Sequence, residues 1–328
     1  MKPSQLKQAL KYAAVKQQRP VFIWSAPGVG KSEIVAQLAK ELKMQLVDKR
    51  LSQSDPSELK GYPWPNQETK TMVFMRDDEL PTKGKGILFL DEINLAPQAT
   101  QAAAYQLILN RRIGTYELPP GWVVIAAGNR TSDRSGVHAL SAALANRFVH
   151  IDLHADVEDW VDWALENNIS DATRGYLRYR PGNLSTDKIE PGVRAYPTPR
   201  TWAFASDILK SNLPAAVELE LLRGTVGDAA GELTAFMRVY KDLPTVDEVL
   251  MNPDKAALPN ELSAKYAIST SLAAKASRDN FDVVMQYVNR LPTEFQVVFM
   301  RDSARRDDGV QKAQSYMKWC VKNHEVMT

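Results

Sequence analysis

Short apolar runs that end in small or charged residues recur through the first half of the chain. Val21–Trp24, Ile87–Leu90 and Trp122–Ala127 contain no polar residue. Uninterrupted runs of this length are typical of strands buried on both faces of a parallel sheet. We therefore expect three central strands, and two further strands that begin at Gln45 and Val149.

Helix-forming segments separate these runs. A first helix is expected from Ser4, whose hydroxyl can cap it, and others at about 33–43, 97–111 and 137–146. Alternating strands and helices predict an α/β fold in which helices cover both faces of a parallel sheet. Residues 54–86 interrupt the alternation, and we expect an insert there that contains a loop or a hairpin.

The strand pattern fades after about residue 153, and helical patterns replace it. Helices are expected at about 156–167, 199–211, 214–225, 228–240, 260–277, 280–290, 293–303 and 308–323. We therefore predict an α/β domain over 1–153, an α-helical domain over 154–245 and a C-terminal helical extension over 246–328.

The turn after the first apolar run has the composition of a phosphate-binding loop. Ser25–Ser32 reads Ser-Ala-Pro-Gly-Val-Gly-Lys-Ser and leads into a helix-forming segment. Glycines allow consecutive N–H groups to surround an anion, and the helix N-terminus favours the same negative charge. The loop begins with Ser25, where the usual pattern has glycine. The residues expected to bind a nucleotide are Ala26, Pro27, Gly28, Val29, Gly30, Lys31, Ser32 and Glu33.

Two acids, Asp91 and Glu92, stand where the second apolar run ends. Behind a phosphate loop, Asp91 and Ser32 are expected to hold Mg²⁺, and Lys31 to contact the β- and γ-phosphates. Glu92 is then the base that polarises the attacking water. Without that loop, a helix start that favours acids would explain the pair equally well.

Three further polar residues complete the predicted catalytic set. Asn129 ends the third run, and its neutral amide can orient the attacking water. Arg147 can reach the nucleotide of a neighbouring subunit, with Arg134 as the second candidate for that role. Arg200 opens a later helix and can contact the phosphates. A turn asparagine and exposed surface arginines are the ordinary alternatives.

The composition is that of an ordinary globular chain. The 328 residues are 44% hydrophobic and 24% charged, and the net charge of +2 does not by itself predict nucleic-acid binding. No apolar run reaches the roughly 20 residues of a membrane span. With Cys320 as the single cysteine and no apolar leader, we expect a cytoplasmic protein. The mixed-charge run Arg301–Asp308 is expected to be solvated.

Taken together, these segments resemble those of AAA+ ATPases. In that resemblance Ser25–Ser32 is the Walker A loop, Ile87–Glu92 the Walker B strand and Asn129 the sensor-1 residue. Arg147 corresponds to the arginine finger and Arg200 to the sensor-2 arginine. The resemblance implies a P-loop NTPase core followed by an all-α lid, with ATP and Mg²⁺ bound and ATP hydrolysed to ADP and phosphate.

A narrower resemblance points to the MoxR branch, including its NorQ/CbbQ-like relatives. Asp91–Pro97 is similar to their Asp-Glu-Ile-Asn-Arg-Ala-Pro run, with leucine at position 95, and Leu144–Phe148 is similar to their Leu-Leu-Asp-Arg-Phe, with asparagine at position 146. Ser54–Gly61 resembles the segment before their helix-2 insert. This resemblance implies a homo-oligomeric ring, expected to be a hexamer, with ATP between subunits. Such rings act as chaperone-like remodellers of protein clients, some of which carry a von Willebrand factor A domain.

The insert carries two aromatic residues, Tyr62 and Trp64, among prolines. Packing of the two rings within a proline-rich loop explains them most simply. The resemblance implies instead that they face the pore or one face of the ring.

Two other functions remain open from the sequence. A DNA-acting motor, such as a helicase, translocase or restriction-type ring, would use cationic contacts. The candidates for those contacts are Arg111, Arg112, Arg130 and Arg134. A binding scaffold without turnover is the other alternative, and the complete set of Lys31, Asp91 and Glu92 argues against it.

Overall fold

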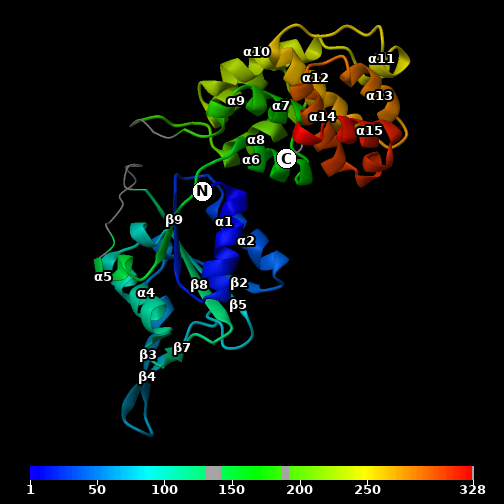
Figure 1. The fold of residues 1–328 in the computed structure, drawn as a ribbon. Coiled ribbons are helices and arrows are strands. Elements are labelled where there is room, and N and C mark those ends of the chain that lie inside the picture. The colour runs from blue at the N-terminus through cyan, green and yellow to red at the C-terminus, as the bar shows by residue number, and fades with distance from the viewer. Residues whose placement is uncertain (131–139, 141, 187–191, 327–328) are drawn as a thin grey trace. The chain divides into compact units, whose positions relative to one another are not determined.

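The computed structural model describes residues 1–130, 140, 142–186 and 192–326. The chain forms two compact units, Met1–Ala155 and Asp156–Thr328 (Figure 1). Residues 137–139 and 141 of the helix expected at 137–146 lie outside the described residues, and helix α5 covers Ala142–Ala145. Arg134 also lies outside the described residues.

A five-stranded sheet forms the centre of the first unit. Its strands are β1 (Val21–Ser25), β2 (Gln45–Arg50), β5 (Gly86–Asp91), β8 (Trp122–Asn129) and β9 (Val149–Asp152). They run parallel in the order β2-β5-β8-β1-β9. This sheet and its helices confirm the predicted α/β core of the P-loop NTPase type. Because β5, β8 and β1 are neighbours, their carboxyl ends meet at one edge of the sheet.

Shorter elements surround this sheet. They are α1 (Pro3–Leu10), α2 (Lys31–Glu41), α3 (Pro56–Lys60), α4 (Gln98–Asn110), β6 (Arg112–Ile113) and β7 (Tyr116–Glu117). The first helix begins at Pro3 and not at the expected cap Ser4, because proline suits the first position of a helix, where no N–H partner is needed.

Alternate residues of the central strands enter two separate hydrophobic cores. Ile87 and Phe89 of β5 pack with α1 and α2 on one face of the sheet. Leu88 and Leu90 pack with α3 and α4 on the opposite face. Figure 1 shows α1 and α4 on opposite sides of the strands. Burial on both faces is the physical reason for the uninterrupted apolar runs in the sequence.

The insert forms an antiparallel hairpin of β3 (Tyr62–Asn66) and β4 (Thr71–Met75) that projects away from the sheet (Figure 1). Tyr62 and Trp64 are 57% and 60% exposed. The interpretation that these rings pack within a loop is therefore wrong. The physical reason is that the hairpin stands alone, so solvent reaches the side chains of both strands.

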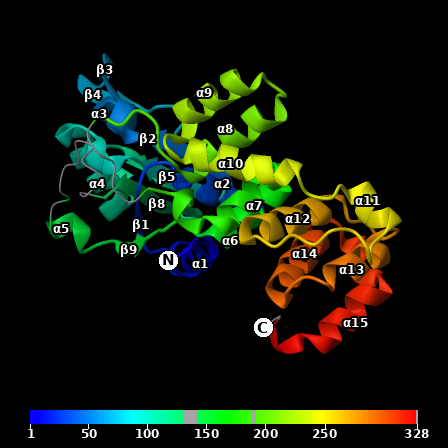
Figure 2. The ribbon, with the colours of Figure 1, turned by 90° about the horizontal axis from the view of Figure 1, so that it is seen from above.

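The described part of the second unit is helical and contains no strand. Its helices are α6 (Val157–Glu166), α7 (Asp171–Tyr179), α8 (Pro199–Lys210), α9 (Ala215–Val226), α10 (Ala229–Lys241), α11 (Val246–Met251), α12 (Leu262–Lys275), α13 (Phe281–Val288), α14 (Thr293–Arg306) and α15 (Gln314–Lys322). Figure 2 shows α12 beside α14, which it contacts. This confirms a helical C-terminal region, whereas its subdivision after residue 245 stays a prediction. None of the described helices is long and apolar enough to cross a membrane.

The sequence pattern missed two helices of this unit, α7 and α11, and extended another too far. The helix expected over 308–323 begins as a 3-10 turn, and α15 starts only at Gln314. Helix α7 has few apolar residues because it buries two arginines, Arg174 and Arg178, so its buried face is not marked by hydrophobicity.

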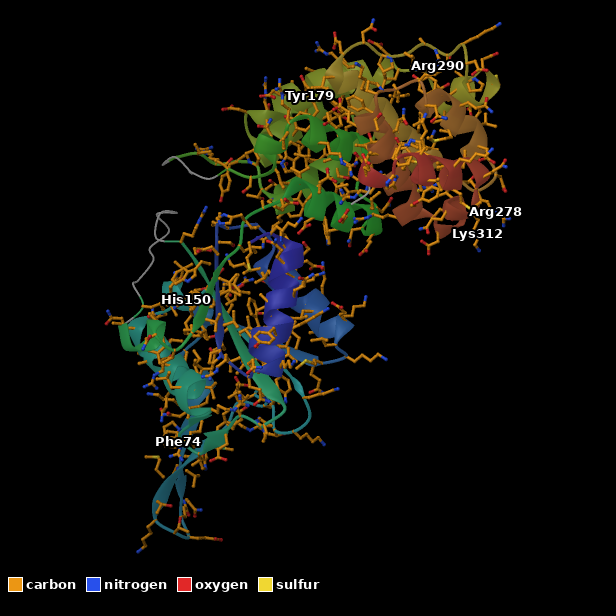
Figure 3. The ribbon with its side chains drawn as sticks, in the orientation of Figure 1. Phe74, His150, Tyr179, Arg278, Arg290 and Lys312 are labelled. Carbon is orange, nitrogen blue, oxygen red and sulfur yellow. The ribbon has the colours of Figure 1, made fainter. Side chains whose placement is uncertain are left out.

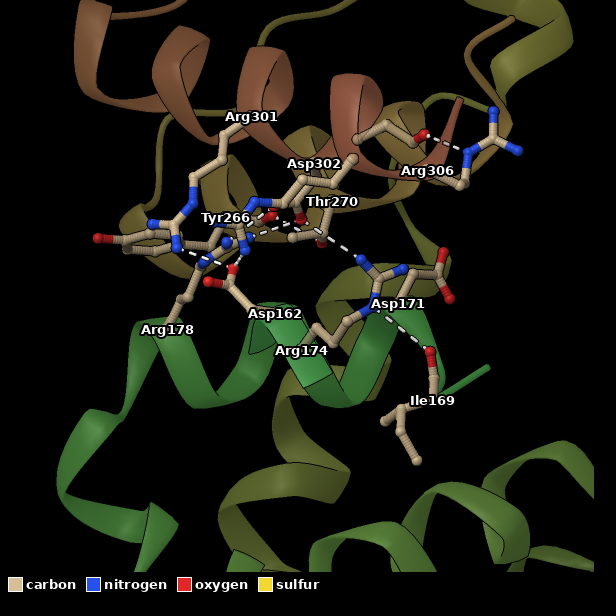
Figure 4. Close-up of polar contacts among 12 residues, drawn as sticks. Asp162, Ile169, Asp171, Arg174, Arg178, Tyr266, Thr270, Arg301, Asp302 and Arg306 are labelled. Atoms are coloured by element: carbon tan, nitrogen blue, oxygen red, sulfur yellow. Dashed lines mark hydrogen bonds and ion pairs between the residues drawn. The ribbon is translucent and has the colours of Figure 1, made fainter. Parts of the chain in front are cut away.

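These two arginines belong to a buried ion cluster that joins α7 to α14 (Figure 4). Asp302 of α14 is fully buried and accepts hydrogen bonds from Arg178 Nη1 at 2.7 Å and Nη2 at 2.8 Å. Arg174 Nη1 lies 3.3 Å from the same carboxylate. The prediction that the run beginning at Arg301 is solvated is therefore wrong at Asp302, because α7 supplies guanidinium partners that the local charge pattern does not show.

Candidate functional site

The loop between β1 and α2 has the backbone conformation that an anion site requires. Gly28 and Gly30 have φ angles of 77° and 102°, which residues with a Cβ atom rarely adopt. Beyond Gly30 the loop is open, since a Cβ atom added there would meet nothing within 4 Å. Helix α2 begins at the next residue, Lys31. Its N-terminal N–H groups and dipole favour a phosphate at this position.

Lys31 is buried and contacts oxygen atoms at the ends of two neighbouring strands. Its Nζ lies 3.0 Å from Asn129 Oδ1 of β8. It also donates to the Ser25 hydroxyl at 3.1 Å and to the Ser25 carbonyl oxygen at 3.3 Å. The serine that replaces the usual first glycine of the loop thus gains a function of its own, because its hydroxyl is an acceptor for Lys31.

Ser32 and Asp91 meet on the other side of the loop. The Ser32 hydroxyl donates to Asp91 Oδ2 at 2.9 Å, and Asp91 Oδ1 accepts from the Glu92 N–H at 2.8 Å. Hydroxyl and carboxylate oxygens are ligands that suit Mg²⁺. Burial, and then the negative charge of Asp91, raise the pKa of Asp48 on the adjacent strand β2. A cation would relieve this repulsion, so the residues present fit a magnesium site.

Glu92 directly follows β5 with a left-handed backbone, at a φ angle of 56°. Its carboxylate accepts a hydrogen bond from the Ser52 hydroxyl and lies 3.8 Å from Arg50 Nε. Neither Ser52 nor Arg50 carries a recognisable sequence signal. Only the parallel pairing of β2 with β5, in which Arg50 lies opposite Asp91, brings them beside Glu92.

A buried asparagine that the sequence pattern does not assign to the site, Asn94, lies behind Asn129. Its Nδ2 donates to the Asn129 carbonyl oxygen at 2.7 Å, and its Oδ1 accepts from the Asn129 N–H at 3.2 Å. Asn94 belongs to the Asp91–Pro97 run, but no spacing rule links it to Asn129, which lies 35 residues further along the chain.

The predicted site residues fall into two groups. Lys31, Ser32, Asp91 and Asn129 are brought into contact at one edge of the sheet, with Glu92 adjacent to Asp91. Three other predicted residues have no contact with this cluster among those given above. Glu33 is exposed and accepts a hydrogen bond from Gln37. Arg147 is exposed after α5, and Arg200 is exposed in the first turn of α8 in the second unit.

The arginines proposed for DNA contact differ in their burial and in their hydrogen-bond partners. The Arg111 guanidinium donates to the carbonyl oxygens of Pro119 at 2.9 Å and Trp122 at 2.7 Å, so it secures its own loop. Arg112 is exposed and Arg130 is half-buried. Fewer arginines are therefore available for contacts with DNA phosphates than the sequence suggests, because Arg111 is engaged within the chain.

Comparisons with known proteins address the same segment. Residues 20–150 match the model of the "ATPase family associated with various cellular activities (AAA)". Midasin from Giardia intestinalis is 30% identical over 202 residues, which are 58% of this chain and 4% of that protein. The ATPase family gene 2 protein homolog B of Homo sapiens is 30% identical over 136 residues, 39% of this chain and 17% of that protein. The chain thus spans a small fraction of these relatives.

Solved structures align with this chain at low sequence identity. A RuvB variant from Thermotoga maritima aligns with a TM-score of 0.42 and 14% identity, over 88% of this chain and 87% of that chain. None of these matches distinguishes the MoxR branch, which stays a prediction. The family match covers the phosphate loop, both acids and Asn129. Residues 20–150, which contain this cluster of contacts, are therefore similar to the ATPase domains that the model describes.

Proposed function

We propose that this chain binds ATP with Mg²⁺ at the carboxyl ends of β1, β5 and β8, hydrolyses it to ADP and phosphate, and uses the energy to remodel a protein partner. The observation that carries the proposal is the pair of contacts from Lys31 to Asn129 at 3.0 Å and from Ser32 to Asp91 at 2.9 Å. They unite a phosphate loop with two other strand ends, so one triphosphate can touch all three.

Each residue of this cluster has a chemical task in the proposal. The loop N–H groups and the Lys31 ammonium bind the β- and γ-phosphates and stabilise the charge that develops there. Ser32 and Asp91 would hold Mg²⁺, which would neutralise phosphate charge when bound. Glu92 accepts the proton of the attacking water, and the Asn129 amide orients that water.

Glu92 must be free of its present partners to act as a base. Its carboxylate accepts a hydrogen bond from Ser52 and lies near Arg50, and both groups compete with a water for its oxygens. A water in reach of Glu92 would have to replace the Ser52 hydroxyl. The arrangement therefore supports a base that Ser52 holds to one side until a substrate is bound.

The proposed working form is a homo-oligomeric ring, expected to be a hexamer in the cytoplasm. Arg147 is exposed at the end of the segment after α5, as an arginine that acts on a neighbouring subunit must be. Arg200, exposed in the first turn of α8, is proposed as the sensor of the bound phosphates. Both roles come from the AAA+ resemblance and are tested by substitution in the assembled ring.

The hairpin supports a protein client rather than DNA. Its exposed apolar residues are Tyr62, Trp64, Met72, Val73, Phe74 and Met75. Figure 3 shows Phe74 on this projecting hairpin. Its base is anchored, because buried Lys49 on β2 donates to Asp77 at 2.9 Å. Apolar side chains presented together on an anchored support favour apolar protein segments, whereas DNA phosphates require cations. A client with a von Willebrand factor A domain is one proposal of this class.

Phosphate release from ATP tests the catalytic part of the proposal. We expect Glu92→Gln to bind ATP and to lower turnover by about 10²- to 10⁴-fold, the usual contribution of a general base. Glu117→Gln, an exposed glutamate on β7 of the same unit, is the matched control and should keep wild-type turnover. Unchanged turnover in Glu92→Gln would remove Glu92 from the mechanism.

The remodelling part is tested with a reduced and alkylated, permanently unfolded polypeptide as the probe. It should stimulate ATP turnover of the wild type and fail to stimulate Trp64→Ser, while Glu68→Gln at the hairpin tip behaves as wild type. Stimulation by double-stranded or single-stranded DNA instead, with a steep decrease as salt is raised, would favour the DNA-acting motor.

A further inference from the structure

We propose that Asn94 is a positioning residue for hydrolysis, which holds Asn129 at the γ-phosphate end of the site; this inference rests on the proposed ATPase function. Asn94 is 0% exposed and lies in the 3-10 turn Ile93–Leu95 that directly follows Glu92. Its side chain touches neither Lys31 nor the acids in the contacts described above. It acts through the backbone of Asn129.

The contact between the two asparagines fixes the end of β8 from behind. Asn94 uses its donor and its acceptor on one residue: Nδ2 to the Asn129 carbonyl oxygen at 2.7 Å, and Oδ1 to the Asn129 N–H at 3.2 Å. A side-chain amide bound in this two-point manner restricts both the position and the rotation of that peptide segment. A strand end that would otherwise fray is therefore held by a side chain from the turn after β5.

Gly128 makes this contact sterically feasible. A Cβ atom at position 128 would lie 2.4 Å from Asn94 Oδ1 and 2.7 Å from Asn94 Cγ. Real Cβ atoms do not approach other atoms so closely, so any larger residue would displace Asn94. Asn94 and Gly128 thus form a matched pair, one side chain filling the space that the other residue leaves.

The held backbone places the Asn129 side chain within reach of Lys31, and this contact sets which way its amide is turned. Its Oδ1 lies 3.0 Å from Lys31 Nζ, and an ammonium has only donors, so the oxygen must be the atom that faces Lys31. The Nδ2 group is then turned away from Lys31 and keeps its donors for a water or a phosphate oxygen. Loss of Asn94 releases this orientation while the phosphate loop and Lys31 remain.

The expected signature is a loss of turnover without a matching loss of affinity. In Asn94→Leu, which has similar size and no hydrogen bonds, kcat should fall by about 10- to 100-fold, the scale of a misplaced catalytic group. The KM for ATP and the affinity for Mg·ATP should stay within about 3-fold, because the groups that bind the phosphates are untouched. Asn94→Ala serves the same purpose if the leucine variant does not fold.

Thr100→Val is the matched control. Thr100 of α4 is also 0% exposed and donates one hydrogen bond to a backbone carbonyl, that of Ser54 at 3.0 Å. Its replacement should lower the thermal stability by an amount similar to that of the Asn94 variant and leave kcat unchanged. A purely structural role for Asn94 predicts instead that both variants behave alike in kcat.

A second variant, at Gly128, disturbs the contact between Asn94 and Asn129 without changing either asparagine. Gly128→Ala places its Cβ 2.4 Å from Asn94 Oδ1 and 2.9 Å from Phe22 Cζ, and should reproduce the low kcat. Adding Gly128→Ala to Asn94→Ala should lower kcat by less than the two single changes combined, because only the closeness to the Phe22 ring then remains. Wild-type kcat in the Asn94 variants, or a loss confined to KM, would overturn the inference. Absence of ATP hydrolysis in the wild type would instead overturn the proposed function.

Discussion

The chain buries charged groups in two places that differ in how their charges are matched. In the second unit, Arg178 donates to two carboxylates at once: to Asp302 at 2.7 and 2.8 Å, and to Glu158 at 3.0 Å. In the first unit, Lys31 donates to uncharged oxygens of Ser25 and Asn129. Both clusters sit where helices or strands meet. The contacts given above pair guanidinium groups with carboxylates in the second unit, and an ammonium with neutral oxygens in the first.

The difference separates a cluster that holds a fold from one that is suited to a ligand. Burial opposes ionisation of Arg178, but Asp302 and Glu158 outweigh it and raise the pKa of Arg178. Removing one partner there leaves an uncompensated buried charge. At the Lys31 cluster the contacts from Ser25 and Asn129 are to neutral oxygens. The proposed phosphate would add a charge-assisted hydrogen bond to the ammonium, and such bonds are stronger than those to neutral oxygens.

The largest expected effect is on stability in the second unit. Asp302→Ala leaves Arg174 and Arg178 buried without their shared carboxylate, and we expect the free energy of unfolding to fall by about 3–5 kcal/mol. Chemical denaturation followed by fluorescence measures it. Asp308→Ala, at an exposed position a few residues further on, should change stability by no more than about 0.5 kcal/mol. Equal small effects would mean that the cluster does not stabilise the unit.

A smaller effect on stability is expected when pH changes the ionisation of Glu158, which contacts Arg178 of the same cluster. Burial of Glu158 opposes its ionisation, but the hydrogen bonds and charge of Arg178 prevail and hold the pKa of Glu158 below its ordinary value of 4.5. A lowered pKa in the folded state adds stability above the unfolded pKa and loses it as pH falls through the folded one. Unfolding free energy should therefore decrease as pH drops below about 4.5.

The comparison variant for this titration is Glu158→Gln. Because it has no carboxyl to protonate, its stability should depend less on pH between about 4.5 and 3 than that of the wild type. Stability curves of the two proteins that run parallel over this interval would show that Glu158 does not contribute to the acid sensitivity.

The smallest effect on stability is expected at the hairpin. Trp64 is 60% exposed, so Trp64→Ser should change the free energy of unfolding by no more than about 0.5 kcal/mol. Trp122 of β8 is 1% exposed and donates to the Lys83 carbonyl oxygen, and Trp122→Ala should cost about 3–5 kcal/mol. A large cost at Trp64 would mean that its ring is packed in solution and is not available to a client.

How much the sequence could predict depends on how local the signal is. The central strands were predictable because burial on both faces leaves an uninterrupted apolar run such as Ile87–Leu90. The meeting of Ser32 with Asp91 was predictable as well, since the loop after β1 and the carboxyl end of β5 lie at the same edge of the sheet, with only β8 between the two strands. To draw these inferences, it is enough to know that the strands are parallel and buried and that their carboxyl ends lie at one edge of the sheet.

Other features depend on partners that are distant in the sequence. Asn94 and Ser52 join the site through strand pairing and a turn, which no spacing rule specifies. Asp302 was expected in solvent because its neighbours are charged, and its true partner Arg178 lies 124 residues away. Trp64 was expected to pack because aromatic rings usually do, but the short hairpin provides no surface for it.

The most direct test of the central claim is calorimetric titration of Mg·ATP into the wild type and Lys31→Ala. We expect saturable binding by the wild type and at least about 100-fold weaker binding, about 2.7 kcal/mol, by Lys31→Ala. Lys40→Ala, an exposed lysine later on the same helix, should bind as the wild type does. Binding of equal strength by Lys31→Ala, or no binding by the wild type, would contradict the account.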